Sequence, residues 1–153
     1  RFFGLSETKR TYRWLRRDDF KPVASLEKYK VFVPAAHGPG ALGAVLSTPV
    51  IGHPVIGHTE TFLSVGCFDT EKEAIACYKY ICSKFARTML GVLKVTQHNS
   101  PEKWEYVPLQ DFSENSDIDW SKPIADIDQQ LYKKYGLTQE EIDFIEKNAV
   151  PME

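Results

Sequence analysis

A strand pattern that runs directly into a helix pattern, between residues 59 and 96, most constrains how this chain folds. Residues 60–68 alternate polar and apolar side chains as a strand does. Thr70 and Glu73 then have the spacing of a capping box, in which each side chain binds a free main-chain N–H at a helix start. Apolar residues recur every three or four positions after this box, which predicts one amphipathic helix over 70–93.

Three further strands and two short helices complete the predicted fold. The strands lie near 29–33, 48–56 and 103–107, and proline or glycine residues interrupt or end each of them. An apolar stripe starts at Ile124 and ends at Gly136, and Thr138 with Glu141 forms a second capping box. The predicted class is α+β: a mostly antiparallel sheet covered by one long amphipathic helix and followed by two short C-terminal helices. These two helices must pack on this core or on another part of a longer parent.

The net charge of −2 conceals a strong asymmetry along the chain. Residues 1–104 carry 15 Lys and Arg against 9 Asp and Glu, whereas residues 105–153 carry 4 against 12. Such asymmetry indicates a basic working surface and an acidic tail with another role. We therefore divide the chain into a basic linker (1–24) from an upstream domain, an α+β core (25–112) and an acidic helical tail (113–153).

Cysteine content and hydropathy predict the compartment. The three cysteines cannot all pair, and Cys77 and Cys82 fall in the apolar stripe of the predicted helix. This pattern is typical of reduced core residues in a cytoplasmic protein. No segment has the length of a membrane span, and no signal peptide opens the chain, which begins at Arg1 and is expected to be a fragment.

The densest basic cluster lies at the N-terminus, where Arg13, Arg16 and Arg17 follow Lys9 and Arg10 and alternate with Tyr12 and Trp14. Cations neutralise phosphates, and aromatic rings stack on bases, so the cluster is a candidate DNA contact. The alternative is a solvated linker, in which Asp18 and Asp19 partly neutralise the positive charges.

A second candidate surface combines the polar face of the predicted helix with neighbouring segments. Its residues are Lys30, Lys84, Arg87, Lys94, Gln97, His98 and Asn99. Glutamine and asparagine can hold adenine by two hydrogen bonds, and the glycine-rich loop 35–43 lets a backbone approach DNA closely. We predict that these residues and the N-terminal arginines line one DNA-binding face. Three alternatives remain open. The connector after the helix, which holds Gln97, His98 and Asn99, can form turns and helix caps, loop 35–43 can be a surface loop without a ligand, and the cations of the helix can pair with the acidic tail.

Several chemistries lack their residues. The sequence contains neither the Asn/Asp-Pro-Pro-Tyr/Phe tetrapeptide that holds a flipped adenine nor a glycine-rich cofactor loop. Asp19-x-Lys21 is only part of a nuclease signature. His53 and His58 have no Cys or carboxylate beside them at a ligand spacing. We therefore expect no catalytic residue, no cofactor and no metal in this chain.

The second half of the chain resembles a known family. The matching segments include Thr59–Leu63, Thr96–His98, Tyr106–Phe112, Leu131–Leu137 and Glu140–Ile142, in the same order and with similar spacing. Over roughly residues 25–153 they are similar to the C-terminal, target-recognition region of adenine-specific DNA methylases of type II restriction–modification systems. The resemblance implies that the parent transfers a methyl group from S-adenosylmethionine to adenine, with or without a fused nuclease. It also implies double-stranded DNA and the upstream catalytic domain of the same polypeptide as partners.

A function of another class remains open. A non-enzymatic interaction or scaffold domain can present the basic helix face to an acidic partner. The salt dependence of binding separates the two, since phosphate contacts give a steep salt slope.

Overall fold

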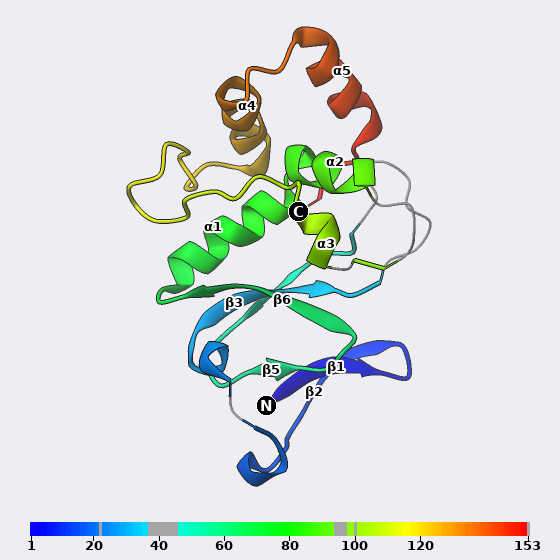
Figure 1. Ribbon diagram of the computed structural model, residues 1–153, viewed down its shortest axis with the longest axis vertical. Coiled ribbons are helices and arrows are strands. Elements are labelled where there is room, and N and C mark those ends of the chain that lie inside the picture. Colours follow the sequence, from blue (N-terminus) through cyan, green and yellow to red (C-terminus); the bar gives the residue numbers. More distant parts are fainter. Residues whose placement is uncertain (22, 37–45, 94–97, 100, 153) are drawn as a thin grey trace.

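The computed structural model describes residues 1–21, 23–36, 46–93, 98–99 and 101–152, which form two small sheets below a layer of helices (Figure 1). The strands are β1 (Phe2–Ser6), β2 (Lys9–Arg13), β3 (Tyr29–Pro34), β4 (Val50–Gly52), β5 (Gly57–His58) and β6 (Phe62–Phe68). The helices are α1 (Glu71–Cys82), α2 (Lys84–Leu93), α3 (Pro101–Trp104), α4 (Ile124–Lys134) and α5 (Gln139–Asn148), with short 3-10 turns η1 (Arg17–Asp19) and η2 (Ala24–Glu27).

The lower sheet has the order β2-β1-β5. Strands β1 and β2 are an antiparallel hairpin, and β5 pairs with β1 in parallel. Ser6 pairs with Lys9, so only Glu7 and Thr8 form the turn, and both have left-handed φ angles of 51° and 70°. Tight two-residue turns require this conformation, which glycine and asparagine adopt at little cost and a β-branched residue does not.

The middle sheet has the order β4-β3-β6, with all strands antiparallel. Its central strand β3 has both faces covered: Phe32 stacks on Phe3 of the lower sheet with ring centroids 6.0 Å apart, while Val31 and Val33 pack with residues of α1. All three β3 side chains have no exposed surface. Strand β3 is therefore the element on which the lower sheet and the helices both pack.

The helical layer begins at the predicted capping box of Thr70 and Glu73, which the structure confirms. The helical segment is interrupted at Ser83, whose extended conformation (φ −60°, ψ 149°) separates α1 from α2. The Ser83 hydroxyl accepts the N–H of Ala86 at 3.1 Å, so it caps the second helix. The apolar stripe continues across this break, and for that reason the sequence predicts one helix where there are two.

The two C-terminal helices pack on this layer (Figure 1). Ile127 and Leu131 of α4 and Ile145 of α5 share a buried cluster with Phe85 of α2. The capping box of Thr138 and Glu141 is present, and Gly136 adopts a left-handed φ of 63° after α4. Helices α4 and α5 thus supply part of the core.

The predicted α+β class is confirmed, including the mostly antiparallel pairing and the two short C-terminal helices. The strands predicted near 29–33 and 60–68 are present as β3 and β6. The strand predicted over 103–107 is wrong, because Pro101 opens helix α3 and Val107 follows it in a turn. Only residues 50–52 of the predicted strand 48–56 are extended in a sheet.

The N-terminal segment also differs from its prediction as a linker. Its first 13 residues form the β1–β2 hairpin, because Phe3 has an apolar neighbour in Phe62 at 4.7 Å and becomes buried. The alternation of polar and apolar residues in this segment is short and includes many charges, so the sequence alone predicts a solvated linker. Pairing with β5, which is distant in the sequence, is what identifies it as part of a sheet. Among the described residues no helix is long and apolar enough to cross a membrane.

Candidate nucleic-acid interface

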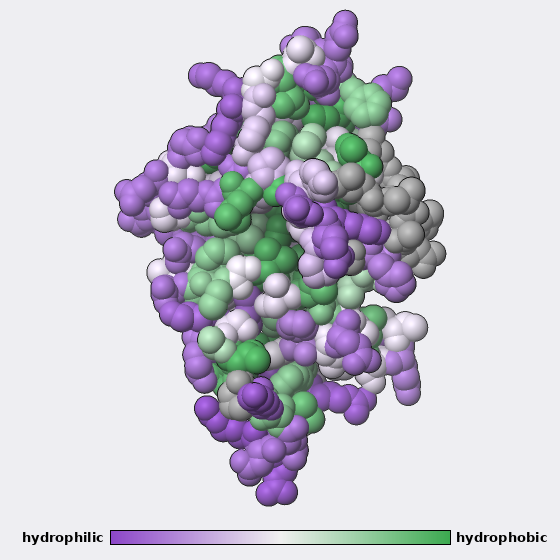
Figure 2. All heavy atoms as spheres, in the orientation of Figure 1, coloured by the Kyte–Doolittle hydropathy of each residue, from purple (hydrophilic) through white to green (hydrophobic). Residues whose placement is uncertain are grey.

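The β1–β2 hairpin lies in the lower part of the molecule (Figure 1). The chain after β2, with the η1 turn, forms the lower end, where hydrophilic side chains cover the surface (Figure 2). Residues of β2 alternate between two faces. Arg10 and Tyr12 contact the rest of the protein on one face while both stay exposed: Arg10 donates to the carbonyl of Thr48 at 2.8 Å, and Tyr12 packs on Phe3 at 4.9 Å. Lys9 and Arg13 lie on the other face and are exposed. The hairpin therefore turns one row of cations toward solvent.

The chain after β2 carries further exposed cations beside an exposed indole. Trp14 is 79 % exposed, and the neighbouring Arg16 and Arg17 are also exposed. The Asp19 carboxylate accepts the main-chain N–H of Arg16 at 3.2 Å, which closes the η1 turn, and Phe20 packs edge-on against Phe2 at 4.9 Å. This segment is thus anchored at its far end while its arginines face solvent.

Lys30 does not belong to this surface. Its side chain is 2 % exposed, and its ammonium donates to the carbonyls of Ser25, Leu26 and Lys28 at 2.8, 3.2 and 2.9 Å. Burial lowers the pKa of Lys30. The prediction that it contacts DNA is wrong, because the ammonium closes the η2 turn from inside the protein.

Arg87 and Lys84 are also unsuited to a DNA contact. Arg87 is 2 % exposed and donates from its guanidinium to the carbonyls of Cys82 and Ser83, at 3.1 and 3.3 Å, and to that of Val150. Burial lowers the pKa of this guanidinium, and Asp128 acts against that effect. Lys84 forms an ion pair with Glu146, and its side chain is 15 % exposed. The alternative in which these cations serve the C-terminal helices is the one that the contacts favour.

The predicted base-reading connector is only partly described. His98 is exposed and lies in an isolated β-bridge with Ala36. Asn99 is 1 % exposed, and its side-chain amide donates to the carbonyl of Pro34 at 2.8 Å, so it holds two segments together and cannot read a base. Lys94, Gln97 and residues 37–45 of the predicted loop lie outside the described residues.

The predicted single DNA face is therefore divided. The hairpin with Arg13, and the arginines that follow it, lie at the lower end of the molecule, whereas α2, with Lys84 and Arg87, lies in the helical layer beyond the middle sheet (Figure 1). Within the part of the chain that the structure describes, the predicted DNA-contact residues that stay exposed beside an exposed aromatic ring are those of the N-terminal segment, Arg13, Arg16 and Arg17 near Trp14 in the sequence.

His53 and His58, the two histidines considered as metal ligands, make contacts with different residues. The His53 ring lies 5.7 Å from Tyr29, and the His58 ring lies 5.1 Å from Phe32. Among the described residues no group of three His, Cys, Asp or Glu side chains is placed to hold a metal ion.

A groove between α1 and residues 112–121 is a feature that the sequence prediction missed. The acidic charge of residues 105–153 is the signal that points to it, but only folding brings those carboxylates beside α1.

No protein-family model matches this chain, and no curated protein and no solved structure matches it. The functional assignment therefore depends on the residues and their geometry.

Proposed function

We propose that this chain is the DNA target-recognition region of a site-specific adenine methyltransferase of a restriction–modification system. Its N-terminal hairpin and the arginines that follow bind the phosphates of duplex DNA. The catalytic domain of the same polypeptide supplies S-adenosylmethionine and the methyl transfer. The observation that carries the DNA-binding part is the run of exposed cations along β2 and the segment after it, which also holds the exposed ring of Trp14. These cations are Lys9, Arg13, Arg16 and Arg17.

The chemistry of this cluster suits a polyanion better than a small ligand. Arginine guanidinium groups form paired hydrogen bonds to phosphate oxygens, and several of them on one surface release condensed counterions from a duplex. Strand β5 pairs only with Phe2 and Phe3 of β1, so beyond Phe3 the hairpin is a two-stranded β-ribbon, which is narrow enough for the major groove. The family resemblance of residues 25–153 supplies the reaction class, and the hairpin geometry supports the contact with DNA.

The rival function, an interaction domain with a basic helix face, has less support from two of the cations of that face. Arg87 is buried, and Lys84 is engaged by Glu146, so α2 does not offer these cations to an acidic partner. The proposed DNA surface uses the hairpin in place of the helix.

The test is binding of the chain to a fluorescent duplex of about 20 base pairs, followed by anisotropy over a range of salt concentrations. Removing two phosphate contacts with Arg16→Ala/Arg17→Ala should weaken binding to every duplex sequence. It should also flatten the slope of log K against log salt by about 2 units.

A matched control removes two exposed cations elsewhere. Lys133→Ala/Lys147→Ala changes the net charge equally on α4 and α5 and should leave the slope nearly unchanged. If both double variants weaken binding alike, the protein responds to its net charge and the hairpin is not the interface. If wild type shows no salt-dependent binding, the DNA-binding function itself fails.

A further inference from the structure

The β1–β2 hairpin carries a polar face at the positions that alternate with its buried Phe3. Side chains of paired residues lie on the same face of an antiparallel ribbon, and every second pair returns to that face. The pairing of Ser6 with Lys9 therefore places four polar side chains on one face: Ser6, Lys9, Thr11 and Arg13. Lys9 and Arg13 are exposed, and Ser6 and Thr11 are half-buried.

A hydrogen bond holds the Arg13 side chain on this face. Its Nη2 group donates to the hydroxyl of Ser6 at 2.7 Å. The two residues belong to different strands, and Arg13 pairs with Phe2, so its side chain extends along the ribbon toward the turn at Glu7. A side chain that is already held in one place loses less rotamer freedom when it binds a ligand. The guanidinium of Arg13 is therefore preorganised.

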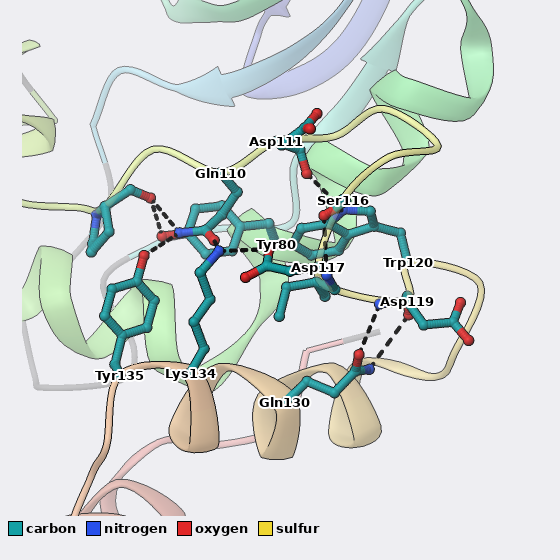
Figure 3. A network of polar contacts seen from close by, with 12 residues as sticks. Tyr80, Gln110, Asp111, Ser116, Asp117, Asp119, Trp120, Gln130, Lys134 and Tyr135 are labelled. Atoms are coloured by element: carbon teal, nitrogen blue, oxygen red, sulfur yellow. Dashed lines mark hydrogen bonds and ion pairs between the residues drawn. The ribbon is translucent and has the colours of Figure 1, made fainter.

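The partner of Arg13 is neutral, so the guanidinium keeps its full charge. Lys134 shows the opposite arrangement, because its ammonium donates to Gln110 at 3.0 Å and pairs with the carboxylate of Asp117 at 2.7 Å (Figure 3). Among the described residues no ion pair joins Arg13 to a carboxylate. A guanidinium has several N–H donors, so the bond to Ser6 leaves donors for a ligand.

Contacts with phosphates and contacts with bases make different demands on a cation. A phosphate contact carries no sequence information, whereas base readout requires donors held against one base edge. A guanidinium matches the O6 and N7 atoms of guanine in the major groove, and this is the commonest sequence-specific contact. Arg13 meets this demand, because its guanidinium is held in place on a ribbon that is narrow enough for the groove.

We propose that Arg13 is a specificity-determining residue, which reads a guanine of the recognition sequence through two hydrogen bonds in the major groove. Ser6 is a positioning residue, because it acts on the base through Arg13. Both roles rest on the proposed function, since the hairpin has to contact duplex DNA. Arg16 and Arg17, in the segment after the hairpin, remain phosphate contacts.

The experiment is a selection with the full chain from a library of duplexes that have a randomised central segment, followed by sequencing of the bound fraction. Wild type should enrich duplexes with a guanine at one position. Arg13→Met removes the donors and keeps an apolar stem, so the preference for that guanine should fall about tenfold. Replacement of the guanine by 7-deazaguanine, which lacks the N7 acceptor, should weaken binding of wild type and leave binding of Arg13→Met unchanged.

Ser6→Ala tests the positioning role. The substitution removes the hydroxyl and no charge, so the preference for guanine should fall by about threefold. The slope of log K against log salt should stay the same, because the number of cations is unchanged. Ser6→Thr supplies a hydroxyl again and should restore the preference.

Arg16→Met is the control for the lost charge. It should weaken binding to every sequence and keep the preference for guanine. The role of Arg13 is overturned if wild type binds duplexes without preferring a guanine, if Arg13→Met keeps the preference, or if Arg16→Met loses it equally. In these cases the duplex is still bound, so the proposed DNA contact stands. Absence of any duplex binding by wild type would remove the proposed function and this role with it.

Discussion

Asp128 of α4 accepts a hydrogen bond of 2.9 Å from the main-chain N–H of Phe85, which lies 43 positions earlier in the chain. Its second carboxylate oxygen accepts the N–H of Lys84 at 3.1 Å, while the hydroxyl of Ser83 accepts that of Ala86. The first three N–H groups of α2 therefore have acceptors, two of them from another helix. Helix α4 and the start of α2 are joined by a buried carboxylate, and this joint has a measurable pH dependence.

The stability contributed by Asp128 should depend on pH. Burial raises the pKa of Asp128 to about 6, and the N–H groups of Phe85 and Lys84 only partly offset this effect. Between about pH 4 and pH 6, Asp128 therefore keeps its proton in the folded state, whereas the same carboxyl group is ionised in the unfolded chain. This contribution is therefore fully present below about pH 4 and is lost as the pH rises through 6. We expect the unfolding free energy of wild type, relative to Asp128→Asn, to fall by about 2–3 kcal/mol between pH 4 and pH 8.

Urea unfolding of the two proteins at both pH values measures this difference. The comparison cancels the other carboxylates, among them Asp111 and Asp119, whose pKa values are lowered and which act in the opposite direction. A constant gap between wild type and Asp128→Asn across this range would show that Asp128 stays ionised in the folded protein.

Arg87→Met should lower stability and not DNA affinity. The substitution leaves the buried carbonyls of Cys82 and Ser83, and the carbonyl of the exposed residue Val150, without the guanidinium that now donates to them. We expect a loss of about 3 kcal/mol in unfolding free energy. Lys147→Met, on the exposed face of α5, should change stability by less than about 0.5 kcal/mol. The prediction is contradicted if the Arg87→Met protein is as stable as wild type but binds DNA more weakly, because Arg87 would then contribute to the DNA contact.

Thr8→Gly should stabilise the protein. Thr8 is β-branched and has a φ of 70° in the turn between β1 and β2, a conformation that glycine adopts without steric strain. Relief of this strain should exceed the added entropy of the unfolded chain and leave a gain of about 1 kcal/mol. Thermal unfolding measures the gain, and Thr11→Gly within β2 serves as the control and should destabilise. A lower melting temperature for Thr8→Gly would mean that the threonine side chain supports the turn.

Trp14→Ala should weaken DNA binding without unfolding the chain. The indole is 79 % exposed, so its removal costs little packing. A ring that wedges between base steps of the duplex and stacks on the base it exposes contributes up to about 1–3 kcal/mol. Anisotropy with the same duplex measures the change. Tyr106→Ala removes a comparably exposed ring, 65 % exposed, from the turn after α3 and should have no effect. Equal affinity for wild type and Trp14→Ala would limit the contact to phosphates.

Local sequence signals determine much of this fold. The capping boxes at Thr70 and Thr138, the glycine at 136 and the alternation over 60–68 all lie where the structure has a helix start, a helix end and a strand. These signals are reliable because the groups that interact are within a few residues of one another. The same locality explains the α+β class, which follows from the order of such elements.

Tertiary structure decided what each cation does. Arg13 and Arg87 belong to the same residue type in the same basic half, yet one is exposed on a hairpin and the other is buried among carbonyls. The break at Ser83 depends on Asp128, and the hairpin depends on Phe3 finding Phe62 and on the partner strand β5. A sequence pattern does not contain these partners, because they are brought together by burial of apolar surface across long separations in the chain. Local hydrogen bonds can therefore be predicted from the sequence. Whether a given cation is buried or exposed depends on how the layers of the tertiary structure pack.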